Sequence, residues 1–181
     1  MKDRIGVLYR YVPLIKSVTR SDCPVASAIA RGSSMLLKLV KHDYEMRFYK
    51  SFAAENIVDC ALARLDSKDL VVNSILEIGE ITGVADIQPG KRVQKSGRTT
   101  GLTSGVVKSI GTTLQVEMKE DEKIWFSDQV VTDMPSQPGD SGALVLDEAQ
   151  KVVGLLFAGS DKLTIFNRIT NIVHKLGIEF V

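Results

Sequence analysis

The chain has 181 residues, of which 44% are hydrophobic and 25% are charged, and its formal net charge at pH 7 is +1. This composition is typical of a globular protein with one large domain or two small ones. The near-neutral charge indicates neither a nucleic acid nor an anionic membrane as a partner, because both favour clustered lysine and arginine.

Targeting signals and cysteines give little further information. No apolar stretch approaches the roughly 20 residues that span a bilayer, and residues 1–14 lack the apolar segment of a signal peptide. We therefore expect a cytoplasmic location if Met1 is the natural start. Cys23 and Cys60, the only two cysteines, lack metal-binding spacing, so no metal or organic cofactor is predicted. A disulfide between them is possible, but the apolar neighbours of Cys60 favour a buried free thiol.

The N-terminal part of the chain mixes two kinds of pattern. Residues 5–18 are short, apolar-rich and broken at Pro13, which favours one or two edge strands over a helix. Residues 24–50 contain helix formers and predict one helix or two short ones, because the Gly-Ser-Ser at 32–34 interrupts the pattern.

From residue 56 onward the pattern is that of a β protein. Short apolar runs are separated by Gly, Pro, Asp and Ser about every ten residues. In residues 169–176 apolar residues recur at helical spacing, and Gly177, a residue type that commonly ends helices, follows them. The residues alone therefore predict a mainly β chain that ends in a helix.

The stretch SQPGDSGALV places Ser141 inside Gly-Asp-Ser-Gly at the start of an apolar run. A serine hydroxyl needs a base within hydrogen-bond reach and donors for the developing oxyanion. Gly139 allows its own amide and that of Ser141 to point at one spot, which would supply those donors. The alternative is a simple turn, for which residues 138–142 also have suitable chemistry.

The longer stretch SQPGDSGALVLDEAQKVVGLLFAGS resembles the nucleophile region of trypsin-like (chymotrypsin-fold) serine peptidases. The resemblance implies that Ser141 is the nucleophile and that Phe157, Ala158 and Gly159 pair main chain to main chain with an extended substrate. It also implies that Pro135 lies near the base of the pocket for the substrate side chain. Because Pro135 carries no charge, a small or apolar side chain is expected there.

Two further segments extend the resemblance to about residues 56–181. NIVDCALARLD is similar to the family's aspartate segment, which implies that Asp59 orients a catalytic histidine; the alternative is an N-cap or turn aspartate. GRTTG, at residues 97–101, is similar to a hairpin of a bacterial group of these peptidases, and here we expect a tight structural turn.

The resemblance implies a mainly β, trypsin-like double β-barrel. We expect a complete second barrel with the C-terminal helix at 80–181, and a partial first barrel at 1–79 with a helical insertion at about 24–50. Such peptidases are hydrolases that cleave peptide bonds, so the expected partner is a peptide or protein substrate. A second copy or an upstream segment is a possible partner that completes the first barrel.

The sequence departs from the family at the catalytic base. Only two histidines are present: His174 lies in the terminal helix, and His42 precedes Asp59 by too few residues and stands among charges. The expected explanation is a truncated chain whose histidine lies upstream of residue 1, so that Ser141 is inactive in this chain.

Two alternatives to a serine endopeptidase stay open. One is a non-catalytic peptide-binding or assembly module with a degenerate peptidase fold. The other is an unrelated β protein with a chance Gly-Asp-Ser-Gly turn, which predicts that Asp59 and Ser141 lie far apart.

Overall fold

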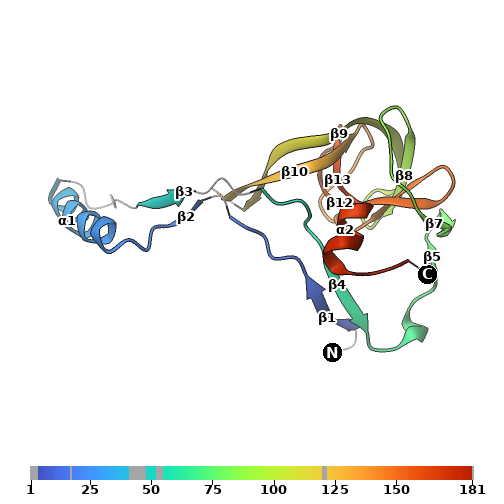
Figure 1. Ribbon diagram of the computed structural model, residues 1–181, viewed down its shortest axis with the longest axis horizontal. Coiled ribbons are helices and arrows are strands. Elements are labelled where there is room, and N and C mark those ends of the chain that lie inside the picture. Colours follow the sequence, from blue (N-terminus) through green and yellow to red (C-terminus); the bar gives the residue numbers. More distant parts are fainter. Residues whose placement is uncertain (1–3, 17, 41–47, 52–54, 120–121, 181) are drawn as a thin grey trace.

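The computed structural model describes residues 4–16, 18–40, 48–51, 55–119 and 122–180, and it is mainly β (Figure 1). The strands are β1 (Gly6–Tyr11), β2 (Val18–Arg20), β3 (Tyr49–Ser51), β4 (Ala61–Leu65), β5 (Ser74–Ile75), β6 (Gly79–Glu80), β7 (Gly83–Val84), β8 (Arg92–Gly97), β9 (Gly101–Lys119), β10 (Glu122–Thr132), β11 (Leu144–Asp147), β12 (Lys151–Gly159) and β13 (Thr164–Arg168). The helices are α1 (Pro24–Val40), a 3₁₀ turn (Lys68–Leu70) and α2 (Ile169–Leu176).

The C-terminal half forms a closed barrel. Its seven-stranded sheet has the order β11-β8-β9-β10-β13-β12-β7. The strand β11 also pairs with β12, and this pairing closes the six strands β8, β9, β10, β11, β12 and β13 into a ring. All pairings in the ring are antiparallel, and β7 adds to β12 in parallel. β8 alternates between buried and more exposed residues from Arg92 to Lys95, whereas β12 buries the neighbours Val152 and Val153 in two different core clusters, one on each face of the sheet. The buried interior contains Val93, Val107, Val130, Val145, Val153 and Phe166.

The terminal helix packs its apolar face against the outside of this barrel. Ile169, Ile172 and Leu176 are buried in a second cluster with Val58 and Val152. Gly177 follows with φ 59°, and its amide donates to the carbonyl of Val173. The predicted helix and its glycine stop are therefore confirmed.

The sheets that the described residues of the N-terminal half form have two strands each. β1 and β4 form an antiparallel pair in which Gly6 faces Leu65 and Tyr11 faces Ala61. Most of β1 is exposed, so this two-stranded sheet covers little apolar surface. The division of the chain at about residue 80 stays a prediction, although all six ring strands begin beyond it.

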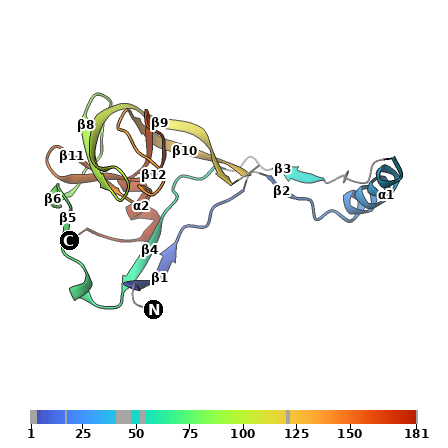
Figure 2. The ribbon, with the colours of Figure 1, turned by 180° about the vertical axis from the view of Figure 1, so that it is seen from behind.

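The predicted helical insertion takes the form of an arm that projects from the barrel (Figures 1 and 2). We define the arm as β2, α1 and β3, in which β2 pairs with β3 and the helix lies at the far end. The helix is continuous across Gly32, so one helix forms and not two. The expectation of helix up to about residue 50 is wrong, because residues 49–51 form a strand; residues 41–47 lie outside the described residues.

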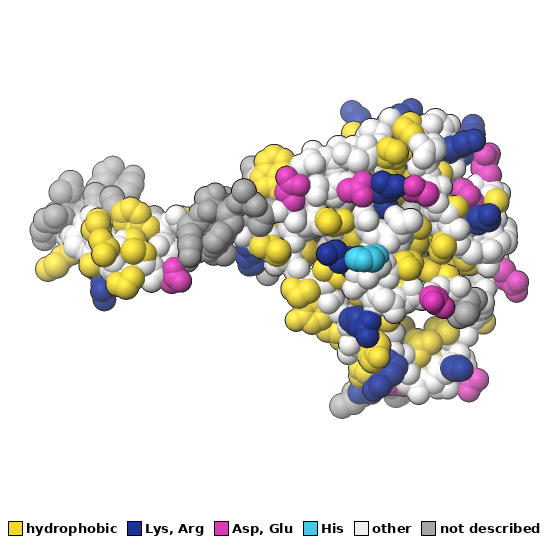
Figure 3. Space-filling model, in the orientation of Figure 1, with side chains coloured by type: hydrophobic (Ala, Val, Ile, Leu, Met, Phe, Trp, Pro, Cys, Tyr) yellow, Lys and Arg dark blue, Asp and Glu magenta, His cyan; other side chains and the backbone are white. Residues whose placement is uncertain are grey.

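The arm helix leaves apolar side chains exposed, and hydrophobic surface is visible on it in Figure 3. Val25, Ile29 and Met35 each expose more than half of their surface. Within the described part of the chain, no helix has the length and apolar character needed to cross a membrane. Both cysteines are free, with Cys23 exposed and Cys60 buried, as the apolar neighbours of Cys60 predicted.

Candidate active site

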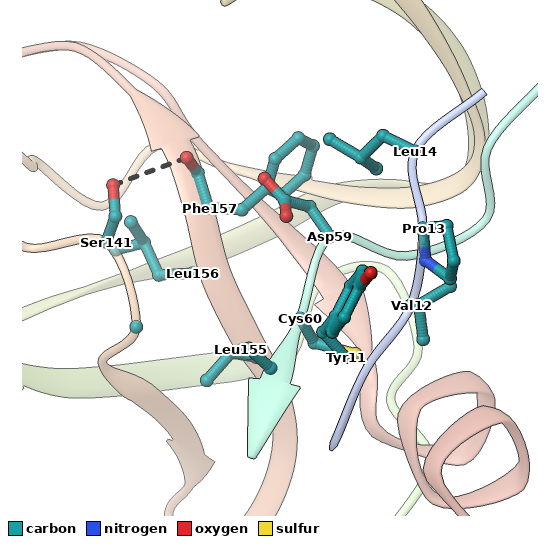
Figure 4. A pocket seen from close by; sticks show the side chains of 12 residues that line it. Tyr11, Val12, Pro13, Leu14, Asp59, Cys60, Ser141, Leu155, Leu156 and Phe157 are labelled. Atoms are coloured by element: carbon teal, nitrogen blue, oxygen red, sulfur yellow. Dashed lines mark hydrogen bonds between the residues drawn. The ribbon is translucent and has the colours of Figure 1, made fainter. Parts of the chain in front are cut away.

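A cavity of about 690 Å³ lies between the barrel and the N-terminal segments (Figure 4). Its walls come from the end of β1 and the segment after it, the residues that lead into β4, the loop before β11, and β12. The lining residues are Tyr11, Val12, Pro13, Leu14, Asp59, Cys60, Ala61, Ser141, Gly142, Leu155, Leu156 and Phe157. Asp59 and Ser141, 82 positions apart in the chain, thus line one cavity, which a chance turn around Ser141 does not predict.

The hydroxyl of Ser141 stands at the cavity wall without a base. Its Oγ donates a hydrogen bond of 3.3 Å to the carbonyl of Phe157 (Figure 4). Among the described residues this carbonyl is its only hydrogen-bond partner, and a peptide carbonyl cannot take the proton of a serine.

The loop that carries Ser141 leaves two amides available. Hydrogen bonds of 3.0 Å from Asp140 N to Gln137 O and of 2.8 Å from Gly142 N to Leu156 O hold its two ends. Within the described chain, the amides of Gly139 and Ser141 donate no hydrogen bond. Gly139 has φ 104°, a conformation that favours glycine. Two unpaired amides, one on each side of the paired Asp140 amide, match the donor set that an oxyanion beside Ser141 requires.

A buried ion pair fixes this loop from behind. Lys95 in β8 and Asp140 have fully buried side chains, and Lys95 Nζ lies 3.1 Å from Asp140 Oδ2. Burial alone would raise the pKa of Asp140. Hydrogen bonds from Thr100 Oγ1 (2.7 Å) and from three backbone amides nonetheless hold that pKa well below its ordinary value. Asp140 is therefore a fixed negative charge that anchors the residue next to Ser141.

The GRTTG hairpin supplies much of this anchor. The amides of Thr99 and Thr100 donate to Asp140 Oδ1 at 2.8 and 3.1 Å, and Thr99 Oγ1 donates to the carbonyl of Pro138 at 2.9 Å. The hairpin thus supports the loop and does not touch the cavity. Sequence reasoning missed Lys95, although it shares the inward face of β8 with Val93 and so signalled a buried partner.

Asp59 is half-buried where the chain enters β4. Burial raises the pKa of its carboxyl group above the ordinary value. Its backbone amide donates to Asn167 Oδ1 at 2.8 Å, and its carboxylate lies on the cavity side in Figure 4. Burial and then the nearby Asp59 charge raise the pKa of the neighbouring Cys60 thiol to about 11, so Cys60 is not a nucleophile at neutral pH.

Comparisons with known proteins rest on structure alone. Neither a protein-family model nor a curated protein matches the sequence. The structure of a chymotrypsin from Cellulomonas bogoriensis is 20% identical with a TM-score of 0.56 and covers 77% of each chain. Protease A from Thermobifida fusca is 21% identical with a TM-score of 0.58, over 77% of this chain and 76% of that one. A Nocardiopsis protease is 20% identical with a TM-score of 0.57, over 74% and 72%.

The chain has a chymotrypsin-like fold. At these identities the likeness concerns the fold, and it confirms the expected β-barrel architecture. In this fold the closed ring β8–β13 supplies the loop of Ser141, and the segments before β4 supply Asp59.

The predicted substrate-binding residues of this chymotrypsin-like chain lie at the end of β12. Phe157 occupies a register shift between the pairs Leu156 with Phe166 and Ala158 with Ile165, and it lines the cavity. Ala158 and Gly159 pair with β13 on one side only, so in the described chain the other edge has no strand partner. Pro135 is exposed and accepts a hydrogen bond from Thr103 Oγ1. Pro135, Ala158 and Gly159 do not line the cavity, and their assignment stays a prediction.

The histidines stand apart from the cavity or outside the described residues. His174 is exposed in the last turn of α2, and His42 belongs to the segment 41–47 that is not described. Among the described residues that line the cavity, none is a histidine. Among the described residues, the Asp59 carboxylate and the Ser141 hydroxyl therefore line one cavity with no imidazole between them.

Proposed function

We propose that this chain carries the nucleophile and the aspartate of a serine endopeptidase. The observation that supports this function best is the shared cavity of Asp59 and Ser141, with two unpaired amides beside the serine. The buried Lys95–Asp140 pair adds a rigid support of the kind that a preorganised site needs.

In the proposed reaction, Ser141 Oγ attacks the carbonyl carbon of the scissile peptide bond while an imidazole takes its proton. The amides of Gly139 and Ser141 donate to the oxyanion that forms. The imidazolium then gives the proton to the leaving amine as the carbon–nitrogen bond breaks, and water releases the acyl group by the reverse sequence. Asp59 stabilises the imidazolium and fixes its orientation.

The imidazole comes from outside the described residues. His42 is one source, and a further segment of chain or another molecule is the other. We favour the second source, because His42 precedes Asp59 by only 17 positions in the chain and has charged neighbours in the sequence. The proposed substrate is a peptide or protein that pairs with the free edge of β12 at residues 157–159.

Labelling with a fluorophosphonate tests this function, because the reagent reacts with activated serines. We expect no labelling of the chain alone, no change in His42→Ala, and labelling at Ser141 when the chain is extended by its upstream reading frame carrying a histidine. Ser141→Ala is the control for the labelled residue. Labelling of neither form would contradict the proposal, and labelling that disappears in His42→Ala would identify His42 as the base.

A non-catalytic peptide-binding module is the second candidate. It is favoured by the hydroxyl of Ser141, whose one hydrogen-bond acceptor among the described residues is the Phe157 carbonyl, and by the unpaired edge of β12. This function predicts binding of extended peptides by the chain and by Ser141→Ala alike, without labelling of either the chain or its extended form.

A further inference from the structure

Three buried amide side chains hold the segments that form the cavity wall opposite Ser141. Asn56, Gln129 and Asn167 expose 5%, 0% and 0% of their surface, and each bonds to the backbone of one of these segments. We call this set the amide clasp. Its members come from the segment before β4, from β10 and from β13.

Gln129 and Asn167 hold the residue that precedes Val58 and the one that follows it. Asn167 Oδ1 accepts from the amide of Asp59 at 2.8 Å, and Gln129 Nε2 donates to the carbonyl of Ile57 at 2.7 Å. Asn167 Nδ2 also donates to Gln129 Oε1 at 2.7 Å, so the two side chains act as one bridge. The bridge thus satisfies a backbone amide and a backbone carbonyl of residues 57–59, which a neighbouring strand would satisfy in a sheet.

Asn56 holds the backbone of the segment that follows β1, which forms another part of the cavity wall. Its Oδ1 accepts from the amide of Ile15 at 2.7 Å, and its Nδ2 donates to the carbonyl of Ile15 at 2.9 Å. Asn56 is itself fixed to β10, because its amide donates to Trp125 O at 2.9 Å and its carbonyl accepts from Ser127 N at 2.8 Å. The extended segment 12–14, which lines the cavity, is thereby attached to the barrel.

The clasp lies where ordinary strand pairing stops. The register of β1 and β4 ends at Tyr11 and Ala61, so residues 12–15 and 57–59 lie beyond their paired part. Apolar side chains of similar size would need no hydrogen-bond partners there, whereas a buried amide that lost its partners would destabilise the fold. Hydrogen bonds, unlike apolar contacts, fix the direction and position of the backbone that they hold.

We propose that Asn167, supported by Gln129, is a positioning residue that sets where Asp59 stands in the cavity relative to Ser141. The catalytic meaning of this role rests on the proposed function, but the positioning itself does not depend on activity. Asn56 sets the facing wall in the same way, so the clasp defines the width of the space that an imidazole must fill.

The test follows Asp59 directly by NMR in the chain as it stands. In Asn167→Leu the Asp59 amide loses its acceptor, so its hydrogen exchange should become at least about tenfold faster. The carboxyl group should move toward water, and its titration midpoint should fall toward the ordinary aspartate value. In Asn167→Asp the accepting oxygen is kept, and the amide exchange should stay within about threefold of the parent.

Thr132→Val is the matched control. Thr132 is fully buried in β10 and its Oγ1 donates to Val106 O at 3.0 Å, but its hydroxyl makes no hydrogen bond to the described residues 57–59. We expect this substitution to lower the free energy of unfolding. The hydrogen exchange of the Asp59 amide should become faster only as far as this lower stability requires, and the titration of Asp59 should not change. The positioning role is overturned if Asp59 behaves alike in Asn167→Leu and Thr132→Val, or if Asn167→Asp loses the protection as fully as Asn167→Leu.

The two proposals fail separately. If Asn167→Leu displaces Asp59 but Ser141 never becomes reactive in the presence of a base, the positioning role stands and the endopeptidase function falls. If Ser141 becomes equally reactive in the parent and in Asn167→Leu, with Asp59 unmoved, the function stands and the positioning role falls.

Discussion

Asp59 lines the same cavity as Ser141, and Asp140 directly precedes Ser141 in the chain. The pKa of Asp59 is raised above the ordinary aspartate value, and that of Asp140 is lowered. Asp140 is fully buried beside Lys95 and accepts several hydrogen bonds, so its pKa is lowered and it stays charged. Asp59 has no such donors to its carboxylate among the described residues, and burial raises its pKa. The charged form of Asp140 is therefore stabilised by its neighbours, whereas burial destabilises the charged form of Asp59.

The first prediction concerns the pH dependence of stability through Asp59. Its folded-state pKa lies above the unfolded value of about 3.9, so its contribution favours folding below that value and is lost as the pH rises through the folded-state pKa. Asp59→Asn should therefore be more stable than the parent at pH 7, by less than about 1 kcal/mol because water screens a half-exposed group. Urea unfolding from pH 3 to pH 8 checks this, and a variant that is less stable at pH 7 than the parent would contradict it.

The second prediction concerns the buried ion pair. Lys95→Met leaves the Asp140 charge buried without its cation and should lower the free energy of unfolding by about 3 kcal/mol. Lys108→Met is the control, because Lys108 pairs with Asp133 at 2.6 Å but both side chains are largely exposed. That loss should stay below about 1 kcal/mol. Equal losses in the two variants, measured by urea unfolding, would show that the buried pair has no special weight.

At the scale of elements, the loop 138–142 combines a strained backbone with close neighbours. A Cβ on Gly139 would clash with Thr99 Oγ1 and would lie 2.8 Å from an Arg98 guanidinium nitrogen. The φ of 104° at Gly139 adds strain for any other residue. The two unpaired amides thus depend on glycine at this position.

The third prediction uses this dependence. Gly139→Ala should shift the loop and slow any base-dependent labelling of Ser141 by at least about 100-fold, the cost of losing one oxyanion donor. Gly90→Ala is matched to it, because Gly90 has φ 84° with open space around it and lies outside the cavity. Both variants should lose about 1 kcal/mol or more of stability, but only Gly139→Ala should lose labelling. A labelled Gly139→Ala would contradict the oxyanion assignment.

Local patterns predicted most elements of the fold, and long-range polar contacts account for what they did not predict. The strands from β8 to β13 and the terminal helix follow apolar periodicity, which the chain shows within a few residues. The bond between Asn167 and Asp59 joins residues 108 positions apart, and that between Lys95 and Asp140 joins residues 45 apart. Although Lys95 falls on the inward face of β8, no local pattern identifies Asp140 as its partner or marks Asn167 as buried, so only the folded chain brings these partners together.

At the scale of the whole molecule, the chain pairs a closed barrel with an open two-stranded sheet. The ring of six strands is closed, with one edge of β12 unpaired only at its end, whereas β1 pairs only with β4 in the described chain and carries exposed Leu8, Tyr9 and Tyr11. An exposed apolar edge strand is a template for pairing with another strand. We propose that a second copy or a further segment of chain covers this edge.

The fourth prediction follows from that edge. At rising concentration, size-exclusion chromatography with light scattering should give a mass above that of one chain, and Leu8→Lys should return it toward one chain. Val72→Lys is the control, because Val72 is 80% exposed, against 65% for Leu8, but lies in no sheet. A parent chain that stays monomeric, with no binding of a dye for apolar surface, would contradict the prediction.

The proposed function depends above all on whether Asp59 and Ser141 face one space that an imidazole can fill. The most direct measurement is fluorophosphonate labelling of Ser141 in a His42→Ala chain, as a function of added imidazole. We expect labelling that rises and saturates with imidazole, is absent in Ser141→Ala and is strongly reduced when Asp59→Asn is added. Labelling that does not respond to imidazole, or that responds equally with and without Asp59, would show that the two residues do not share such a space.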